Sequence, residues 1–213
     1  MKIAYLFIAA AMLASAAPGL PARSDADQYT AKADTPTALV AAAVIPPDQV
    51  RNEFATTLVP RYYVLEVAVY PQNGANFDIT PLDFGLRLDG RLIRPADPRT
   101  IAAQNQKRGR ARSKDVLLYP TVGVSTGSWG AGTNVGLGVG MGGGAPGPAS
   151  TDQDRRVMQS ELEDRALMDR TSAKPVAGYL YFPVGDAKSS NAELIYQYDG
   201  GEVKLPLILP KQK

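Results

Sequence analysis

A run of five cations is the sharpest local charge feature of the chain. It lies within QNQKRGRARSKD, residues 104–115, and consists of Lys107, Arg108, Arg110, Arg112 and Lys114. Guanidinium and ammonium groups at this density attract phosphates, anionic lipid headgroups and acidic polymers. No aromatic residue lies within the run to stack on bases, which argues against nucleic acid as the partner. We therefore expect either a solvated loop or a contact surface for an anionic partner.

Catalysis would have to rest on carboxylates, lysine or tyrosine, because the chain has no histidine and no cysteine. Their absence excludes serine-hydrolase triads, most zinc enzymes, cysteine nucleophiles, disulfides and a lipid-modified N-terminal cysteine. A carboxylate pair of the glycosidase type stays open as an alternative, because acidic residues accompany the predicted strands. These residues are Glu66, Asp78, Asp83, Asp89 and Glu193. Most such residues face solvent, so we predict no catalytic residue, no cofactor and no metal site.

A glycine-rich segment follows the basic run. Residues 116–150 contain no charged residue, and glycine alternates there with Val135, Leu137, Val139 and Met141. The same glycines would form a small-residue ladder of the kind found in membrane helix pairs. Helix formation is disfavoured because each glycine costs about 1 kcal/mol relative to alanine. We favour a surface loop, with self-assembly or membrane association as the alternative.

The single tryptophan of the chain, Trp129, lies inside this glycine-rich segment. Tryptophan is enriched among residues that anchor a partner. We therefore group Trp129 with the basic run as a candidate contact residue for an anionic or protein partner, although it could equally pack the loop down.

The N-terminus has the pattern of a secretory signal peptide. Lys2 supplies a positive charge, residues 3–14 are an uncharged apolar run, and Ala14-Ser15-Ala16 offers small residues at a cleavage site. About 12 apolar residues are too few to span a bilayer, which needs about 20. We expect residues 1–16 to be removed, with cleavage as late as residue 22 as the alternative. The predicted location is the periplasm or the extracellular space.

Residues 17–45 are rich in Ala, Pro, Ser, Thr and Asp and have few large apolar side chains. Such a composition buries too little surface to offset its ordering entropy, so we predict a flexible leader. A short helix is expected to begin near Pro47, with Val50 and Phe54 on one face.

Six short strands are predicted from apolar and polar residues that alternate with a period of two. Their approximate ranges are 61–70, 84–88, 91–93, 176–184, 192–198 and 203–209. Asp89-Gly90 and Asp199-Gly200-Gly201 predict tight turns between paired strands. Pro206 places the last strand at a sheet edge, because proline donates no hydrogen bond. Short strands with such turns favour an antiparallel sandwich.

One domain over residues 46–210 is expected, interrupted by the basic and glycine-rich insertion 105–150. The insertion leads into an amphipathic helix at 151–171, with Thr151 as its N-cap and Asp152 and Asp154 in its first turn. Its apolar face is expected to consist of Val157, Met158, Leu162, Ala166 and Met168.

Two stretches resemble secreted bacterial immunoglobulin-like domains of uncharacterised function. The first is YYVLEVAV, residues 62–69, with Asn73-Gly74 and the run from Asp83 to Leu86; the second is GYLYFP, residues 178–183. The resemblance covers about half of the chain. It implies a ligand-free sandwich and export, and it transfers no catalytic residue.

These observations predict a mainly β, immunoglobulin-like antiparallel β-sandwich with a glycine-rich insertion and one amphipathic helix. The predicted role is an exported, non-catalytic binding or structural module of the cell envelope. Its partner would be a protein or an anionic envelope component, not nucleic acid, and any membrane contact would be peripheral. The alternatives are a self-assembling or membrane-associating protein and a carboxylate-based envelope hydrolase.

Overall fold

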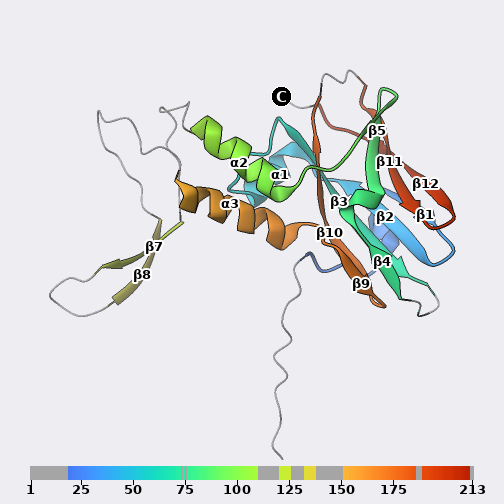
Figure 1. Cartoon of the computed structure of the whole chain (residues 1–213), viewed down its shortest axis with the longest axis horizontal. Helices are drawn as coiled ribbons and strands as arrows, with labels where there is room; N and C mark the ends of the chain where they lie inside the picture. The colour runs from blue at the N-terminus through green and yellow to red at the C-terminus, as the bar shows by residue number, and fades with distance from the viewer. Residues whose placement is uncertain are drawn as a thin grey trace, which may run out of the picture.

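The computed structural model of the chain describes residues 19–72, 74, 76–109, 120–125, 132–137, 151–185 and 189–211, with side chains described except at 107–109, 120–125 and 132–137. Within this part the protein is mainly β, with antiparallel sheets and three α-helices (Figure 1). The predicted signal peptide, residues 1–16, lies outside the described residues.

Two four-stranded antiparallel sheets form the body of the fold. The first has the order β1 (Ala31–Asp34), β2 (Ala38–Val44), β3 (Tyr62–Pro71), β10 (Val176–Pro183). The second has the order β12 (Gly201–Ile208), β11 (Asn191–Tyr198), β5 (Phe84–Leu88), β6 (Arg91–Ile93). Two smaller pairs join β4 (Phe77–Ile79) to β9 (Arg170–Ser172), and β7 (Pro120–Ser125) to β8 (Gly132–Leu137).

The main core lies between the two sheets. Leu65 and Phe182 of the first sheet share one buried cluster with Phe84, Leu86 and Leu194 of the second. The alternation predicted for these strands is therefore confirmed, since one set of side chains from each strand faces this core. In β12, Leu205 and Leu207 are buried while Ile208 is exposed, and the strand lies at the sheet edge, as Pro206 predicts.

The predicted turns are also confirmed. Asp89 and Gly90 both have positive φ, at 49° and 76°, and join β5 to β6. Asp199 and Gly200 join β11 to β12, with Tyr198 paired to Gly201.

The prediction of a flexible leader at 17–45 is wrong. Residues 31–34 and 38–44 form β1 and β2, and β2 pairs with β3 along its whole length. Val40, Ala41 and Ala42 are fully buried. Short side chains are sufficient here because both faces of β2 are covered by other parts of the chain, so the strand buries its surface without large residues.

Strand β3 is buried on both faces as well, although its alternating pattern is typical of a strand with only one buried face. Tyr63, Leu65, Val67 and Val69 face the core between the sheets, but the opposite face is buried as well. At one end of this outer face, the helices α1 (Pro47–Glu53), α2 (Pro98–Gly109) and α3 (Asp152–Arg165) enclose a second cluster. At the other end, the segment 19–29, with the short helix η1 (Ala26–Gln28), covers a third.

Helix α2 was not predicted, and it shifts the start of the insertion from 105 to beyond Gly109. Asp97-Pro98 begins this helix, and the Asp97 carboxylate accepts a hydrogen bond from the Arg99 amide. Ile101 and Ala102 are its fully buried residues.

Helix α3 begins as predicted but ends earlier. Thr151 and Asp154 form a capping box. On the predicted apolar face, Leu162 and Ala166 are buried, but Val157 is 51% exposed, so that part of the prediction is wrong. The helix ends at Arg165 rather than near 171, and Arg170–Ser172 form β9. The loop interpretation of the glycine-rich segment is wrong for β7 and β8, which pair antiparallel with Val122 opposite Val135. Both strands contain the β-branched residues valine and threonine, which are enriched in strands.

Within the described part of the chain, no helix combines the length and the apolar character needed to cross a membrane.

Candidate functional site

The structure does not assemble the predicted contact residues into a describable site. Lys107 and Arg108 belong to the last turn of α2, where only the backbone is described. Arg110, Arg112, Lys114 and Trp129 lie outside the described residues. The basic run therefore stays a prediction.

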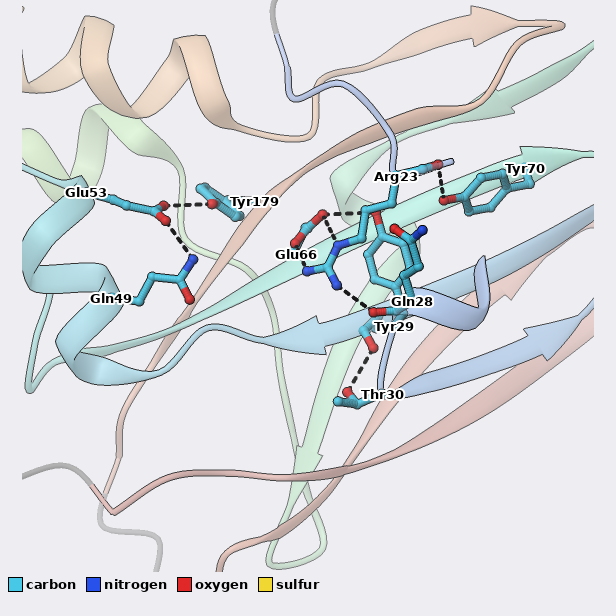
Figure 2. Close-up of polar contacts among 10 residues, drawn as sticks. Arg23, Gln28, Tyr29, Thr30, Gln49, Glu53, Glu66, Tyr70 and Tyr179 are labelled. Carbon is cyan, nitrogen blue, oxygen red and sulfur yellow. Dashed lines mark hydrogen bonds and ion pairs between the residues drawn. The ribbon is translucent and has the colours of Figure 1, made fainter. Parts of the chain in front are cut away.

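The most extensive polar network of the outer face of the first sheet centres on Glu66. Figure 2 shows Arg23 extended between this carboxylate and the ring of Tyr29. The guanidinium donates to both Glu66 oxygens, from Nη2 at 2.5 Å and from Nε at 3.1 Å. The Tyr29 hydroxyl donates to Glu66 Oε1 at 2.9 Å, and the Tyr70 hydroxyl donates to the Arg23 carbonyl at 2.8 Å.

This network fixes the segment 19–29 on the sheet. The hydrogen bond from Arg23 to Glu66 raises the pKa of the guanidinium, and burial raises the pKa of Tyr29 above its ordinary value. Every polar group named here already has a partner within the chain. The network therefore holds the segment 19–29 against the sheet. Because these polar groups are hydrogen-bonded to one another, none of them is left for catalysis.

A second network joins the helices to β10. The Tyr179 hydroxyl donates to Glu53 Oε2 at 2.9 Å, and Gln49 Nε2 donates to Glu53 Oε1 at 2.6 Å (Figure 2). The Arg165 guanidinium lies 4.9 Å above the ring of Phe54 and 3.9 Å from Glu53. These contacts fix one end of α3 and, with it, the connection that follows.

That connection forms one wall of a cavity of about 270 Å³ at the outer edge of β10. Three separate stretches of chain, 80–82, 95–98 and 166–169, surround the cavity, and the edge itself contributes Tyr179, Leu180 and Tyr181. Its apolar lining residues include three prolines, Pro81, Pro95 and Pro98, together with Leu82, Ala96, Leu167 and Met168. Leu82 is 69% exposed, which makes it the rim of the cavity.

An open acidic cleft adjoins this cavity. Its volume is about 540 Å³, and it shares Thr80 and Asp169 with the cavity. Asp78 and Asp83 complete its carboxylates, and the Thr171 hydroxyl donates to Asp78 at 2.5 Å. We call the cavity and this cleft together the β10 groove.

Burial raises the pKa of Asp83 above its ordinary value of 3.8. The nearby carboxylates of Asp169 and Asp199 add to the rise, while a hydrogen bond from Thr80 and the charge of Arg94 oppose it. Arg170 also lines the cleft, so its lining combines three carboxylates with one guanidinium.

We expect Asp83→Asn to raise the urea midpoint of unfolding near pH 7. A raised pKa means that the folded state binds the proton more readily than the unfolded state, so ionised Asp83 opposes folding at neutral pH. The advantage of the amide should shrink as the pH falls through the raised pKa and should vanish below 3.8, where the carboxyl is neutral in both states. A matched Asp48→Asn change, at an exposed position of α1, should give no gain at either pH. An equal gain from Asp83→Asn at pH 7 and pH 3 would contradict this explanation.

The carboxylates singled out in the sequence thus divide into three kinds. Glu66 is paired with Arg23, and Glu193 is paired with Arg87 on the second sheet. Asp89 belongs to the β5–β6 turn. Only Asp78 and Asp83 come together, and their neighbour Asp169 was not predicted, because no local pattern links positions so far apart in the chain.

Among the described residues, no three or more His, Cys, Asp or Glu side chains are grouped so that they could hold a metal ion. No family model, curated protein or solved structure matches the chain.

Proposed function

We propose that the protein is an exported, non-catalytic binding module of the cell envelope, built on an immunoglobulin-like sandwich. The observation that carries the proposal is the β10 groove, an apolar cavity with an acidic mouth at a sheet edge. Apolar pockets with a few polar groups at one side are typical of binding sites. The basic run 107–114 is a second proposed contact, for an anionic envelope component.

The order of the strands supports an immunoglobulin-like sandwich. In that fold, strands A, B and E lie in one sheet and strands C, F and G in the other, with chain crossings from B to C and from E to F. Here β2, β3 and β10 would correspond to A, B and E, while β5, β11 and β12 would correspond to C, F and G. The usual neighbour of E, strand D, has no counterpart in the first sheet, and the cavity lies beside that edge.

Cell fractionation tests the proposal. Cells that express the full-length chain would be separated into soluble periplasmic, secreted and envelope fractions, and the envelope would be washed first with salt and then with detergent. We expect the protein in the soluble exported fractions or in the salt wash. Retention until detergent is added would instead favour the membrane-associating alternative, and recovery in the cytoplasm would contradict export.

The packing of residues 19–22 predicts where the signal peptide is cut. The Gly19 amide donates to the Asp164 carbonyl at 2.9 Å, and the Leu20 amide donates to the Ala177 carbonyl at 3.0 Å. Leu20 also packs against two of the buried clusters. We therefore expect the exported protein to begin at Ala17, after the Ala14-Ser15-Ala16 site. Intact mass and N-terminal sequencing of the exported protein would measure this, and a mature chain that begins at Arg23 would contradict it.

One observation favours a second candidate, the carboxylate-based envelope hydrolase. Asp83 and Asp169 line the same open cleft, and the pKa of Asp83 is raised, as a general acid requires. Incubation of the purified protein with isolated cell-wall glycan, followed by an assay for new reducing ends, would test it. Release that disappears in both Asp83→Asn and Asp169→Asn would establish the hydrolase, whereas no release from the wild-type protein would leave the binding module.

A further inference from the structure

The size of the cavity limits what it can hold. Pockets for drug-sized molecules and cofactors usually measure about 300–1,000 Å³. The cavity at the edge of β10 measures about 270 Å³, and apolar side chains make up most of its lining, with Asp97 and Asp169 at its wall. Its dimensions suit one large apolar side chain or two small ones.

The neighbouring backbone limits how such a side chain can be presented. A peptide could in principle extend the first sheet by pairing with the outer edge of β10. That edge is already used at three points. The carbonyls of Ala177, Tyr179 and Tyr181 accept from the amides of Leu20 at 3.0 Å, Leu167 at 3.0 Å and Ala96 at 2.7 Å, respectively. An occupant must therefore bind through its side chains rather than as an added strand.

The charge around the groove determines which charge its occupant should carry. Four carboxylates and one guanidinium line the groove: Asp78, Asp83 and Asp169 lie in the cleft with Arg170, and Asp97 lies at the cavity wall. The carboxylates therefore outnumber the cation there. Arg94 is engaged within the fold, where its guanidinium donates to the carbonyls of Leu82 and Phe84. The chain as a whole carries a net charge of +2, so the local charge of the groove is opposite in sign to the net charge of the chain. Charge complementarity favours a cation next to the apolar side chain.

We infer that the β10 groove binds an extended segment of a partner protein in which an apolar side chain lies next to lysine or arginine. The apolar side chain enters the cavity past Leu82, and the cation lies in the cleft against Asp83 and Asp169. This inference deepens the proposed function and rests on it, because it names the partner chemistry of the same binding module.

Fluorescence polarisation with three labelled synthetic peptides tests the inference on the purified protein. The first peptide alternates leucine and lysine, the second has glutamate in place of lysine, and the third has glycine in place of leucine. We expect the first to bind at least tenfold more tightly than either of the others, and added salt to weaken it. Equal binding of the first and third peptides would mean charge attraction alone and would overturn the groove as the site.

A pair of matched variants locates the binding. Leu82→Arg puts a cation at the rim of the groove and should weaken the leucine–lysine peptide at least tenfold. Ile208→Arg places arginine at another exposed apolar residue, on β12 outside the groove, and should leave the affinity unchanged. Equal losses in both variants, or none in either, would overturn the assignment.

The chain's own basic run is the other source of such a segment, since it is followed by the apolar residues 116–119. Wild-type protein that binds none of the peptides would overturn the inference of a separate partner. If a variant with glutamine at the five cations then bound the leucine–lysine peptide, the basic run itself would be the occupant. Peptide binding by purified protein does not depend on cellular location, so this test and the fractionation can fail independently.

Discussion

Arg23→Met is expected to lower the free energy of unfolding by about 2 kcal/mol, although a composition-based interpretation assigns Arg23 to a flexible leader. The methionine leaves the Glu66 carboxylate, whose side chain is only 10% exposed, without its cationic partner. Removal of one member of a fully buried ion pair costs about 3–5 kcal/mol. The smaller value is expected because the Arg23 side chain is 33% exposed and Tyr29 still donates to Glu66.

Urea unfolding followed by far-ultraviolet circular dichroism would measure the loss. Lys32→Met is the matched control, because it removes the same charge from an ion pair with Asp27 that is well exposed on both sides. Exposed pairs contribute little, so the control should unfold with the wild-type midpoint. Equal unfolding midpoints for Arg23→Met and Lys32→Met would show that the outer-face network does not hold the segment 19–29.

A double variant separates the loss of attraction from the loss of packing. Glu66→Gln removes the carboxylate that Arg23→Met leaves unpaired, so the two changes together should cost less than the sum of the single changes. We expect a coupling of about 1–2 kcal/mol, within the range found for residues in one hydrogen-bond network. Strict additivity would assign the destabilisation to the apolar stem of Arg23 and its stacking on Tyr29.

The strands that could be predicted from the sequence are those whose pattern reflects a single buried face. In β12 and β5, apolar residues alternate with polar ones because one side faces the core and the other faces water. The turn at Asp89-Gly90 was predictable for a local reason too, since few residues other than glycine adopt positive φ at low cost. The alternation and the turn motif can each be recognised within a window of about ten residues.

The parts that escaped prediction depend on partners distant in the sequence. The alanines of β2 are buried on two sides: Ala38 and Ala42 face the core between the sheets, and the segment 19–29 covers Ala41 and Ala43. Nothing in their own composition indicates this burial. Helix α2 buries only a small part of its surface, at Ile101 and Ala102. It therefore has few apolar residues and no clear helical pattern in the sequence. The β10 groove is assembled from stretches near 80, 96 and 168, which no local periodicity connects.

The walls of that groove depend on a single close approach of two backbones. The connection after α3 crosses β10 at Gly178, where a Cβ atom would lie 2.3 Å from the Leu167 nitrogen and 2.7 Å from the Ala166 carbonyl carbon. Both neighbours are backbone atoms, and the Leu167 amide is held by its hydrogen bond to the Tyr179 carbonyl. A change of side-chain rotamer therefore cannot relieve the clash that a Cβ atom at this position would make.

Gly178→Ala is accordingly expected to destabilise the fold by about 3 kcal/mol, at the upper end of what an added methyl group costs in a packed interior. Gly185→Ala is the matched control, because no atom lies within 4 Å of the added carbon, and it should leave the unfolding midpoint within the error of the measurement. The two variants would be compared by urea unfolding and by binding of the leucine–lysine peptide to protein that is still folded. We expect Gly178→Ala to weaken that peptide as well, because relief of the clash must move Leu167 and Met168, which line the cavity. A Gly178→Ala protein as stable as the Gly185→Ala control would show that the connection does not rest on β10, and the cavity would then lose the wall on which the proposed binding depends.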